Sequence, residues 1–450
     1  MSFVLTKSFI EEVEAAVLQQ KEATIRAAFE EMHPADISTV LYELDTEACK
    51  YILDLLDDKT SAEILSNLEE DTLEEFLPVF APHELARFFD FIDSDDAVDM
   101  LEVLPLKMRE EVISYIKNRE KAGYILDLLR YEEDVAGGLM AKELIKANIN
   151  WTVVQCIEEI RRQAERVNKI HSVYVIDDEG VLLGRVSIKE ILLAEDHTQI
   201  ADIYIPNIVT VYTYEDEEEV ARIMQRYDLE AIPVISMRGT LLGRITIDDV
   251  MDVVKEQAED SQRAMSGISG DIEEADSVWK LSKARLPWLM IGMMGGLVGA
   301  QFMGFFENEL RVVPAMAFFI PLIMATGGNV GIQSATLVVQ ALADSSGLQE
   351  KLGRRLIRSL TVALLNGFVI ASVVLLTNYL FTGDFRLSFV VSTALFSVVI
   401  VASLMGTITP LILNQFKVNP AVASGPFITT ANDLIGLAIY FMTARLLYNL

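Results

Sequence analysis

Residues 325–336 read ATGGNVGIQSAT and lie in the most apolar third of the chain. Three glycines, an asparagine, a glutamine and a serine interrupt a run that is otherwise apolar on both sides. Non-helical backbone is tolerated at membrane depth only where it faces protein or a water-filled path. We therefore predict a break in a membrane span here, where Gly327 and Gly328 expose carbonyl oxygens and Asn329 adds an amide oxygen. Such oxygens suit hard cations or their water shells.

Charge and hydrophobicity are segregated along the chain. Its 450 residues are too many for one compact domain, and 51% hydrophobic residues rarely occur in a single globular unit with a formal net charge of −30. Residues 1–279 hold 61 of the 67 acidic residues but only 26 of the 37 Lys and Arg residues. The two cysteines, Cys49 and Cys156, argue against a disulfide scaffold and fit a reducing cytosol.

Five apolar runs in the back part are long enough to cross a membrane, which takes about 20 residues each. They lie near residues 286–306, 314–342, 357–381, 387–413 and 422–447. Five spans put the two ends on opposite sides. Eight Lys and Arg residues flank one side of these runs and three flank the other, which predicts a cytoplasmic front part and an outside C-terminus in the cell membrane. The eight are Lys280, Lys283, Arg285, Lys351, Arg354, Arg355, Arg358 and Lys417.

One run could instead be a buried soluble helix, which would move the C-terminus to the cytoplasm and leave the charge asymmetry accidental.

The fifth run has a polar face at helical spacing, made by Gly425, Thr429, Asp433 and Gly436. An unpaired carboxylate at mid-membrane costs at least about 2.5 kcal/mol, so it normally marks an ion or substrate path. The alternative is a buried basic partner, but Arg445 and Lys417 lie near span ends.

The cytoplasmic part contains an internal repeat at an offset of 59 residues. VIDDEGVLLGRVSIKEIL, residues 175–192, aligns without gaps with VISMRGTLLGRITIDDVM, residues 234–251. Each copy predicts a strand, a glycine turn, a second strand and a helix. The pair resembles tandem CBS domains, and in that family the spacing that includes Thr246 and Asp249 can hold a nucleotide such as ATP. A helix capping box explains the same two residues, so both interpretations stay open.

Residues 1–135 show helical patterns only, with Leu, Ile and Phe at three- and four-residue steps. Their turns are acidic, as in LEEDTLEE and DSDDAVD. Asp95 and Asp99 are four residues apart on one helix face, where like charges repel unless a cation sits between them. A solvated surface accounts for any one of these acids. It does not account for the whole set, because nearby Lys and Arg do not balance the charge.

These observations predict a multi-domain fold. An all-α helical N-terminal domain occupies 1–135, an α/β tandem CBS pair 136–255, a connecting helix and linker 256–285, and an α-helical membrane domain with five transmembrane helices 286–450. With TGGNVGIQSATL at 326–337, the acid in the fifth span and the junction RYEEDVAGGLM at 130–140, the chain resembles the MgtE family of magnesium channels from about residue 10 to its end.

The resemblance implies a homodimer with an ion path on the two-fold axis, lined by spans two and five, and a connecting helix near 250–266. It also implies that the protein is a channel, not an enzyme, and that it imports Mg²⁺ down its electrochemical gradient. The expected partners are Mg²⁺, membrane lipid and a second copy of the chain, with no nucleic acid. One departure is Ile332, which follows Gly331 where some members of the family carry a polar residue.

By the same resemblance, nine acids match metal-bridging positions of the family. High cytosolic Mg²⁺ would bridge them and hold the connecting helix across the path, while at low Mg²⁺ repulsion would separate them and open it. Roughly four such sites would switch the equilibrium within one decade of concentration. The nine are Glu63, Asp95, Asp99, Glu218, Asp228, Asp249, Asp252, Glu259 and Asp260.

Alternatives come from other classes of protein. Mg²⁺ keeps several waters, so oxygens that face a hydrated ion suit it, but such oxygens also suit Mn²⁺, Co²⁺ and Ca²⁺. A coupled divalent-cation transporter also breaks spans at the midplane, although five spans cannot form two equal inverted halves. A membrane enzyme regulated by CBS domains lacks a P-loop or a Gly-x-Ser-x-Gly motif. A scaffold would leave Asp433 unexplained.

Overall fold

The computed structural model describes residues 5–164, 167, 169–270, 272, 276–343 and 352–448. It divides into two compact units, Met1–Val254 (unit 1) and Lys255–Leu450 (unit 2), and each has its own apolar core. Lys351, one of the eight cations in the charge argument, lies outside the described residues.

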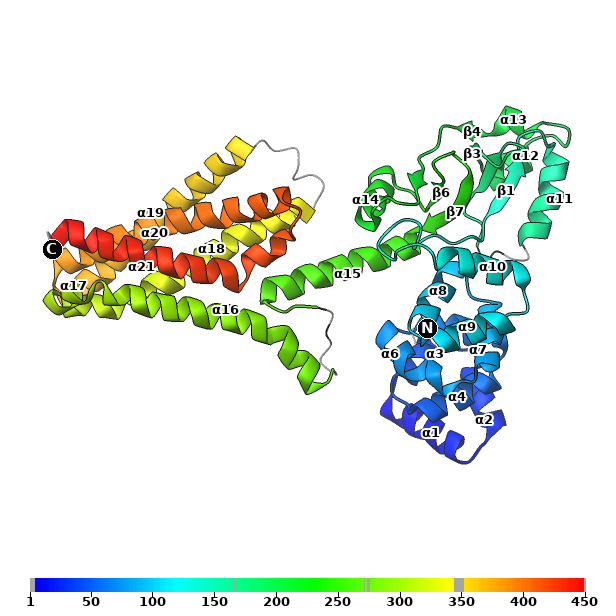
Figure 1. Ribbon diagram of the computed structural model, residues 1–450, viewed down its shortest axis with the longest axis horizontal. Coiled ribbons are helices and arrows are strands. Elements are labelled where there is room, and N and C mark those ends of the chain that lie inside the picture. Colours follow the sequence, from blue (N-terminus) through cyan, green and yellow to red (C-terminus); the bar gives the residue numbers. More distant parts are fainter. Residues whose placement is uncertain are drawn as a thin grey trace. The chain divides into compact units, whose positions relative to one another are not determined.

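Short amphipathic helices fill the first part of unit 1 (Figure 1). Acidic caps explain where several begin, because the carboxylates of Asp45 and Asp57 accept hydrogen bonds from the backbone N–H groups of the first helical turn. Their Leu, Ile and Phe side chains face inward, and Phe88 and Phe89 are fully buried. The prediction of an all-helical N-terminal domain is confirmed. The helices are α1 (Lys7–Leu18), α2 (Glu22–Phe29), α3 (Pro34–Leu41), α4 (Thr46–Leu55), α5 (Asp58–Leu65), α6 (Glu70–Phe76), α7 (Pro82–Phe89), α8 (Ser94–Glu102), α9 (Leu106–Tyr115) and α10 (Arg119–Leu128).

Two α/β repeats follow in unit 1. One sheet has the strand order β1-β2-β3-β4 and the other the order β5-β6-β7. In each sheet the first pair of strands is parallel and the next pair is antiparallel. The strands are β1 (Ile145–Asn148), β2 (Val173–Ile176), β3 (Leu182–Val186), β4 (Ile205–Pro206), β5 (Val211–Tyr212), β6 (Ala231–Ile235) and β7 (Leu241–Thr246). The helices are α11 (Val153–Ala164), α12 (Ile188–Leu193), α13 (Ile200–Ile203), α14 (Glu217–Tyr227) and α15 (Ile247–Ser266), the last of which continues into unit 2.

The 59-residue repeat is also a structural repeat. Val175 pairs with Gly184 in one sheet, and Val234 pairs with Gly243 in the other. The two hairpin turns, at Gly180 and Gly239, have φ angles of 82° and 81°, which favour glycine. They also bond to each other, because Leu182 N–H donates to the Gly239 carbonyl at 2.9 Å and Leu241 N–H donates to the Gly180 carbonyl at 3.1 Å. The predicted strand, turn and strand are therefore confirmed in both copies.

The helical domain shares its core with the second repeat. One apolar core contains residues of both the helical domain and the second repeat. Ala136 and Met140, in the segment after α10, are fully buried in this core. Ala141 and Arg244 exchange backbone hydrogen bonds of 2.8 and 2.9 Å, which attach this segment to β7. A side chain at Gly243 would meet the Ala141 carbonyl oxygen at 2.7 Å. The first repeat has a separate core, so the helical domain is docked chiefly on the second.

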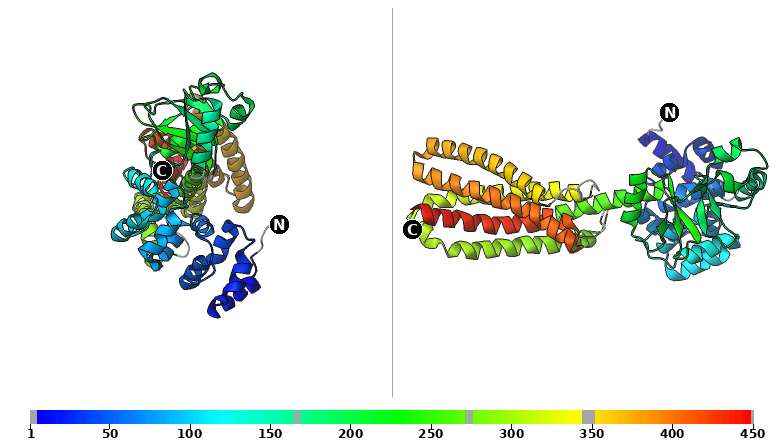
Figure 2. Two further views of the ribbon diagram at one scale, coloured as in Figure 1. Left: turned by 90° about the vertical axis from the view of Figure 1, so that its right-hand side faces the viewer. Right: turned by 90° about the horizontal axis from the view of Figure 1, so that it is seen from above.

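The described residues of unit 2 form five helices long and apolar enough to cross a membrane, as predicted, and Figure 2 shows them running side by side. The most buried is α20, which packs against three of the others. The helices are α16 (Val278–Gly304), α17 (Glu307–Val312), α18 (Ile320–Ala343), α19 (Leu352–Thr382), α20 (Phe385–Gln415) and α21 (Pro426–Tyr448). The second candidate span begins in a 3₁₀ turn, Pro314–Phe319.

The predicted break at residues 325–336 is wrong, because α18 is one continuous α-helix through this stretch. Gly327, Gly328 and Gly331 are all buried, and a side chain at each would meet atoms of α21 within 4 Å. The glycines therefore act by letting neighbouring helices approach closely, as small residues do in membrane bundles. Their carbonyl groups belong to the helix and are not exposed ligands.

Hydroxyl groups join three membrane helices. Ser359 of α19 hydrogen-bonds to Ser403 at 3.1 Å and to Thr407 at 2.7 Å, both on α20. Ser334 of α18 donates to Ser403 at 3.1 Å. Such bonds stabilise helix association in lipid. They lie beside Gly406 of α20, where a side chain would meet the backbone of α18 at Gly331 and Ala335.

We expect Gly406→Ala to destabilise unit 2. The new methyl group would meet the Ser334 Cβ at 2.9 Å and the Ala335 nitrogen at 3.2 Å, and backbone cannot yield as a side chain can. Overpacking of this kind costs about 1–3 kcal/mol. The measurement is the thermal unfolding midpoint of the detergent-solubilised protein. Gly292→Ala, with open space around it, is the matched control, and equal midpoints for the two variants would contradict this account of the packing.

Candidate functional site

The glycine face of α18 lies against the polar face of α21. A side chain at Gly328 would meet the Thr429 Cγ2 at 3.2 Å and the Asp433 Oδ1 at 3.7 Å. Thr429 and Asp433 are half-buried, one helical turn apart on α21. Gly425 caps the preceding 3₁₀ turn, and its carbonyl accepts the Thr429 hydroxyl at 3.5 Å. The structure thus brings together Gly328, Thr429 and Asp433, three of the predicted ion-path residues.

Asp433 has no cationic partner among the described residues. Arg445, weighed as its partner from the sequence, instead pairs with Glu309 at 2.6 Å. Glu309 is itself buried, at 4% exposure, so this pair satisfies the acid of α17. A carboxylate without a counter-ion inside a membrane bundle is costly unless an ion or water reaches it.

A polar stripe faces outward on α18. Asn329 and Gln333 are four residues apart, and both are exposed on the surface of unit 2. Asn329 therefore does not share the buried face of Gly327 and Gly328. Amide groups exposed to hydrocarbon cost several kcal/mol each. The stripe is better accommodated against protein or water than against lipid.

The end of α15 packs where α21 begins. A side chain at Gly425 would meet the Met265 carbonyl oxygen at 2.9 Å and the Ala264 carbonyl oxygen at 3.2 Å. The Trp288 indole N–H donates to the Ser269 hydroxyl at 2.7 Å, which ties the segment after α15 to α16. Gly425 is thus in contact with the last turn of the connecting helix, eight residues before Asp433.

A second candidate site is a group of carboxylates from α8 and the first turn of α15, which we call the acidic cluster and define as Asp95, Asp96, Asp99 and Asp249. Burial and the carboxylates of Asp96 and Asp249 raise the pKa of Asp95 well above its usual range. The Asp95 Oδ1 is buried and has no hydrogen-bond partner among the described residues. The cluster therefore holds a buried carboxylate oxygen without a protein hydrogen-bond partner among the described residues.

The other members of the acidic cluster are also perturbed. Burial, with Asp93 and Asp249, raises the pKa of Asp96 to about 7. The protein packed around Asp99, with Asp96 and Glu133, raises its pKa to about 8, although Asp99 keeps an open side toward solvent. These shifts all favour the neutral form, as expected where like charges are crowded. A cation bound among these carboxylates would favour their ionised forms instead.

Asp249 joins the acidic cluster from the first turn of α15. Burial raises its pKa to about 6, while hydrogen bonds from Thr246 oppose the increase. Its Oδ2 accepts the Thr246 N–H at 2.6 Å and the Thr246 hydroxyl at 3.0 Å, so the capping interpretation of these two residues is present in the structure. Both bonds use Oδ2, which leaves Oδ1 for another ligand.

The remaining predicted metal-bridging acids are dispersed. Glu63 is exposed, and its Oε1 lies 3.8 Å from the Lys59 Nζ. It precedes Ser66 by one helical turn, and the Ser66 side chain hydrogen-bonds to the Asp96 carboxylate. Glu259 and Asp260 of unit 2 pair with Arg263 at 3.2 and 3.6 Å. In the described parts of the chain, no three His, Cys, Asp or Glu side chains are close enough to hold a metal ion directly. The other exposed acids of the set are Glu218, Asp228 and Asp252.

Sequence reasoning missed part of the acidic cluster. It selected Asp95 and Asp99 by their spacing and passed over Asp96, which lies between them and faces both Asp93 and Asp249. Glu133, from the junction after α10, raises the pKa of Asp99. The density of acids in DSDDAVD was the available signal for Asp96. No local pattern points from Glu133 to α8, because their proximity arises only from docking.

Three family models match the chain. The model described as the MgtE intracellular N domain matches residues 32–134, the CBS domain model matches 134–197 and 200–256, and the divalent cation transporter model matches 320–443. The "Magnesium transporter MgtE" of Thermus thermophilus is 33% identical over 97% of both chains. That of Bacillus subtilis is 29% identical over 92% of both chains.

Two solved structures resemble unit 1. The soluble part of a magnesium transporter has a TM-score of 0.51 and 29% identity, and covers 56% of this chain and 99% of its own. The cytosolic domain of the Mg²⁺ channel MgtE in complex with ATP has a TM-score of 0.51 and 32% identity, and covers 54% of this chain and 99% of its own.

Without divalent cations, we expect unit 1 to become more stable as the pH falls from about 8.5 to about 6.5. The pKa values of Asp96 and Asp99, about 7 and 8, exceed the ordinary value of 3.8. The folded protein therefore binds more protons than the unfolded chain in this window, so stability rises as the pH falls. The measurement is thermal unfolding in EDTA.

In the same measurement, the double variant Asp96→Asn, Asp99→Asn should show a flatter pH profile than the wild type. Glu75→Gln, at an exposed acid of α6, should keep the wild-type profile. A double variant with the full pH dependence would show that the effect arises elsewhere in unit 1.

Proposed function

Because this chain belongs to the MgtE family of divalent cation transporters, we propose that it is a magnesium channel of the cell membrane. It imports Mg²⁺ down the electrochemical gradient, and cytosolic Mg²⁺ closes it. The observation that carries the proposal is Asp433, a carboxylate inside the fifth span with no cation beside it among the described residues.

The ion path is proposed to lie on the two-fold axis of a homodimer. The outward-facing Asn329 and Gln333 of α18 support this, since a second copy would cover them and line an aqueous path with amides. Two Asp433 side chains facing one another repel, which favours a divalent occupant over none. Each would accept hydrogen bonds from the water of a hydrated Mg²⁺, which that ion keeps readily.

The acidic cluster is proposed as the sensor that closes the path. A hydrated ion can bridge carboxylates through its waters, so the site does not need three direct ligands. Mg²⁺ bound among Asp95, Asp96, Asp99 and Asp249 would offset their repulsion and stabilise the docked helical domain. Asp249 lies on α15, and the far end of that helix contacts Gly425. This contact supports a route from the sensor to the path.

An adenine nucleotide is a second proposed ligand. A relative's cytosolic domain was solved in complex with ATP, and the free Asp249 Oδ1 could receive a ribose hydroxyl next to Thr246. Because Asp249 also belongs to the acidic cluster, nucleotide and Mg²⁺ would act on the same residue.

The alternative transport mode is coupling of Mg²⁺ uptake to the movement of another ion. It predicts uptake that requires a gradient of that second ion.

We expect Asp433→Asn to reduce Mg²⁺ uptake into proteoliposomes by at least about tenfold, because loss of the charge removes the attraction that holds the ion. The measurement uses purified protein, low internal Mg²⁺ and no other ion gradient. Glu307→Gln, at an exposed acid of α17, should transport like the wild type. Wild-type uptake that appears only with a proton or sodium gradient would favour the coupled transporter. Absence of Mg²⁺ uptake under either condition would refute both.

The triple variant Asp95→Asn, Asp96→Asn, Asp99→Asn should keep its uptake when cytoplasmic Mg²⁺ is raised to millimolar levels. Neutral amides bind the ion far less tightly, so the docked state gains little from it. The measurement is the Mg²⁺ concentration on the cytoplasmic face that halves uptake. The same concentration for variant and wild type would remove the acidic cluster from the gating mechanism.

A further inference from the structure

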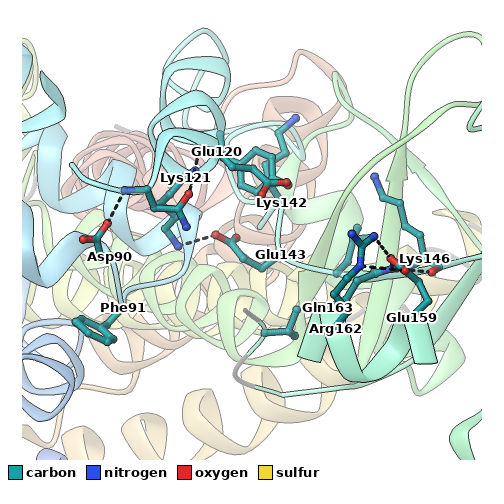
Figure 3. A pocket seen from close by; sticks show the side chains of 14 residues that line it. Asp90, Phe91, Glu120, Lys121, Lys142, Glu143, Lys146, Glu159, Arg162 and Gln163 are labelled. Carbon is teal, nitrogen blue, oxygen red and sulfur yellow. Dashed lines mark hydrogen bonds and ion pairs between the residues drawn. The ribbon is translucent and has the colours of Figure 1, made fainter. Parts of the chain in front are cut away.

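A pocket of about 500 Å³ lies between the helical domain and the first repeat, both in unit 1 (Figure 3). Asn118, Lys121 and Tyr124 line it from around α10. Lys146 lines it from β1, and Arg162 from α11. Thr246 and Asp249 are not part of its wall. The volume falls within the range of about 300–1,000 Å³ that is usual for small-molecule sites.

Most cations around the pocket already have acidic partners. Lys121 pairs with Glu143 at 2.6 Å, Lys142 pairs with Asp127 at 2.6 Å, and Arg162 pairs with Glu159. Figure 3 shows Lys121 pointing to Glu143, and Arg162 and Glu159 gathered near Lys146. Two acids of the wall, Glu143 and Glu159, are thus engaged in ion pairs.

Lys146 is different. Its ammonium makes no ion pair or hydrogen bond among the described residues, and its side chain is half-buried. Burial and the neighbouring Lys142 lower the pKa of Lys146, and the Glu120 carboxylate offsets this effect only in part. A partly desolvated ammonium that lies beside another cation and has no ion pair of its own is stabilised by an added anion.

We propose that this pocket binds a small phosphate-bearing anion, with the phosphate held between Lys146 and Arg162. Arg162 contributes two N–H groups to Glu159, at 3.1 and 2.5 Å, and a guanidinium has five. The remaining donors suit a phosphate, which Arg and Lys recognise through charge-assisted hydrogen bonds.

Space for the rest of the ligand lies beyond Lys146. A shallower hollow of about 540 Å³ shares Lys146, Glu159 and Gln163 with the pocket and extends to Trp151. An organic group attached to the phosphate could lie there against the indole. Because two domains build the pocket, a bound anion favours their docked arrangement.

Labelling with pyridoxal 5′-phosphate tests the proposal. Its aldehyde condenses with a lysine amine and releases water, and borohydride then reduces the imine to a stable secondary amine that peptide mass mapping locates. The detergent-solubilised full chain is labelled in parallel with pyridoxal, which has the aldehyde but no phosphate. The exposed Lys189 reports background reactivity. We expect Lys146 to be labelled about tenfold more by the phosphate form than by pyridoxal, and inorganic phosphate to protect it.

Arg162→Gln should remove the preference of Lys146 for the phosphate form, while its labelling by pyridoxal stays unchanged. Arg161→Gln, at the adjacent exposed arginine outside the pocket wall, should keep the preference. Equal labelling of Lys146 by the two aldehydes, or labelling that phosphate does not reduce, would overturn the proposal. The test measures binding alone, so its result is independent of transport.

Discussion

Crowded, buried carboxylates cannot all stay ionised unless a cation joins them, and the acidic cluster of unit 1 is subject to this constraint. The apolar core through Ala136 and Met140 docks the helical domain on the second repeat. The same docking places Asp95 and Asp96 of α8 opposite Asp249 of α15. Apolar burial favours the docked arrangement while charge repulsion opposes it, so an ion that neutralised these carboxylates would shift the balance toward docking.

A contrasting interaction lies close to the acidic cluster. Glu143 accepts hydrogen bonds from the Ser94 N–H and hydroxyl and pairs with Lys121. Its pKa is lowered, because Lys121 and Ser94 outweigh the effect of burial. This buried pair joins the first turn of α8 to the segment before β1 without a metal. Attraction at Ser94 and repulsion at Asp95 therefore act on adjacent residues of the same helix.

Local patterns were enough to predict the architecture. The 59-residue sequence repeat implied that the two hairpins pair in the same register. Strand length and the turns at Gly180 and Gly239 are local properties, so the sequence alone carries them. Composition alone predicted the five spans. The continuity of α18 was not predictable in this way, because glycine weakens a helix locally while packing against α21 and α20 restores it. Asp96 and Glu133 were not predicted for a related reason. Only the docked fold brings Asp96 close to Asp249 and Glu133 close to Asp99.

The helix α15 is a single element of 20 residues, so it is about 30 Å long. It begins at a carboxylate of the acidic cluster and ends against Gly425. Under the proposed gating, the backbone hydrogen bonds of this one helix, and not a flexible loop, would transmit a change at Asp249 to the turn beside Gly425.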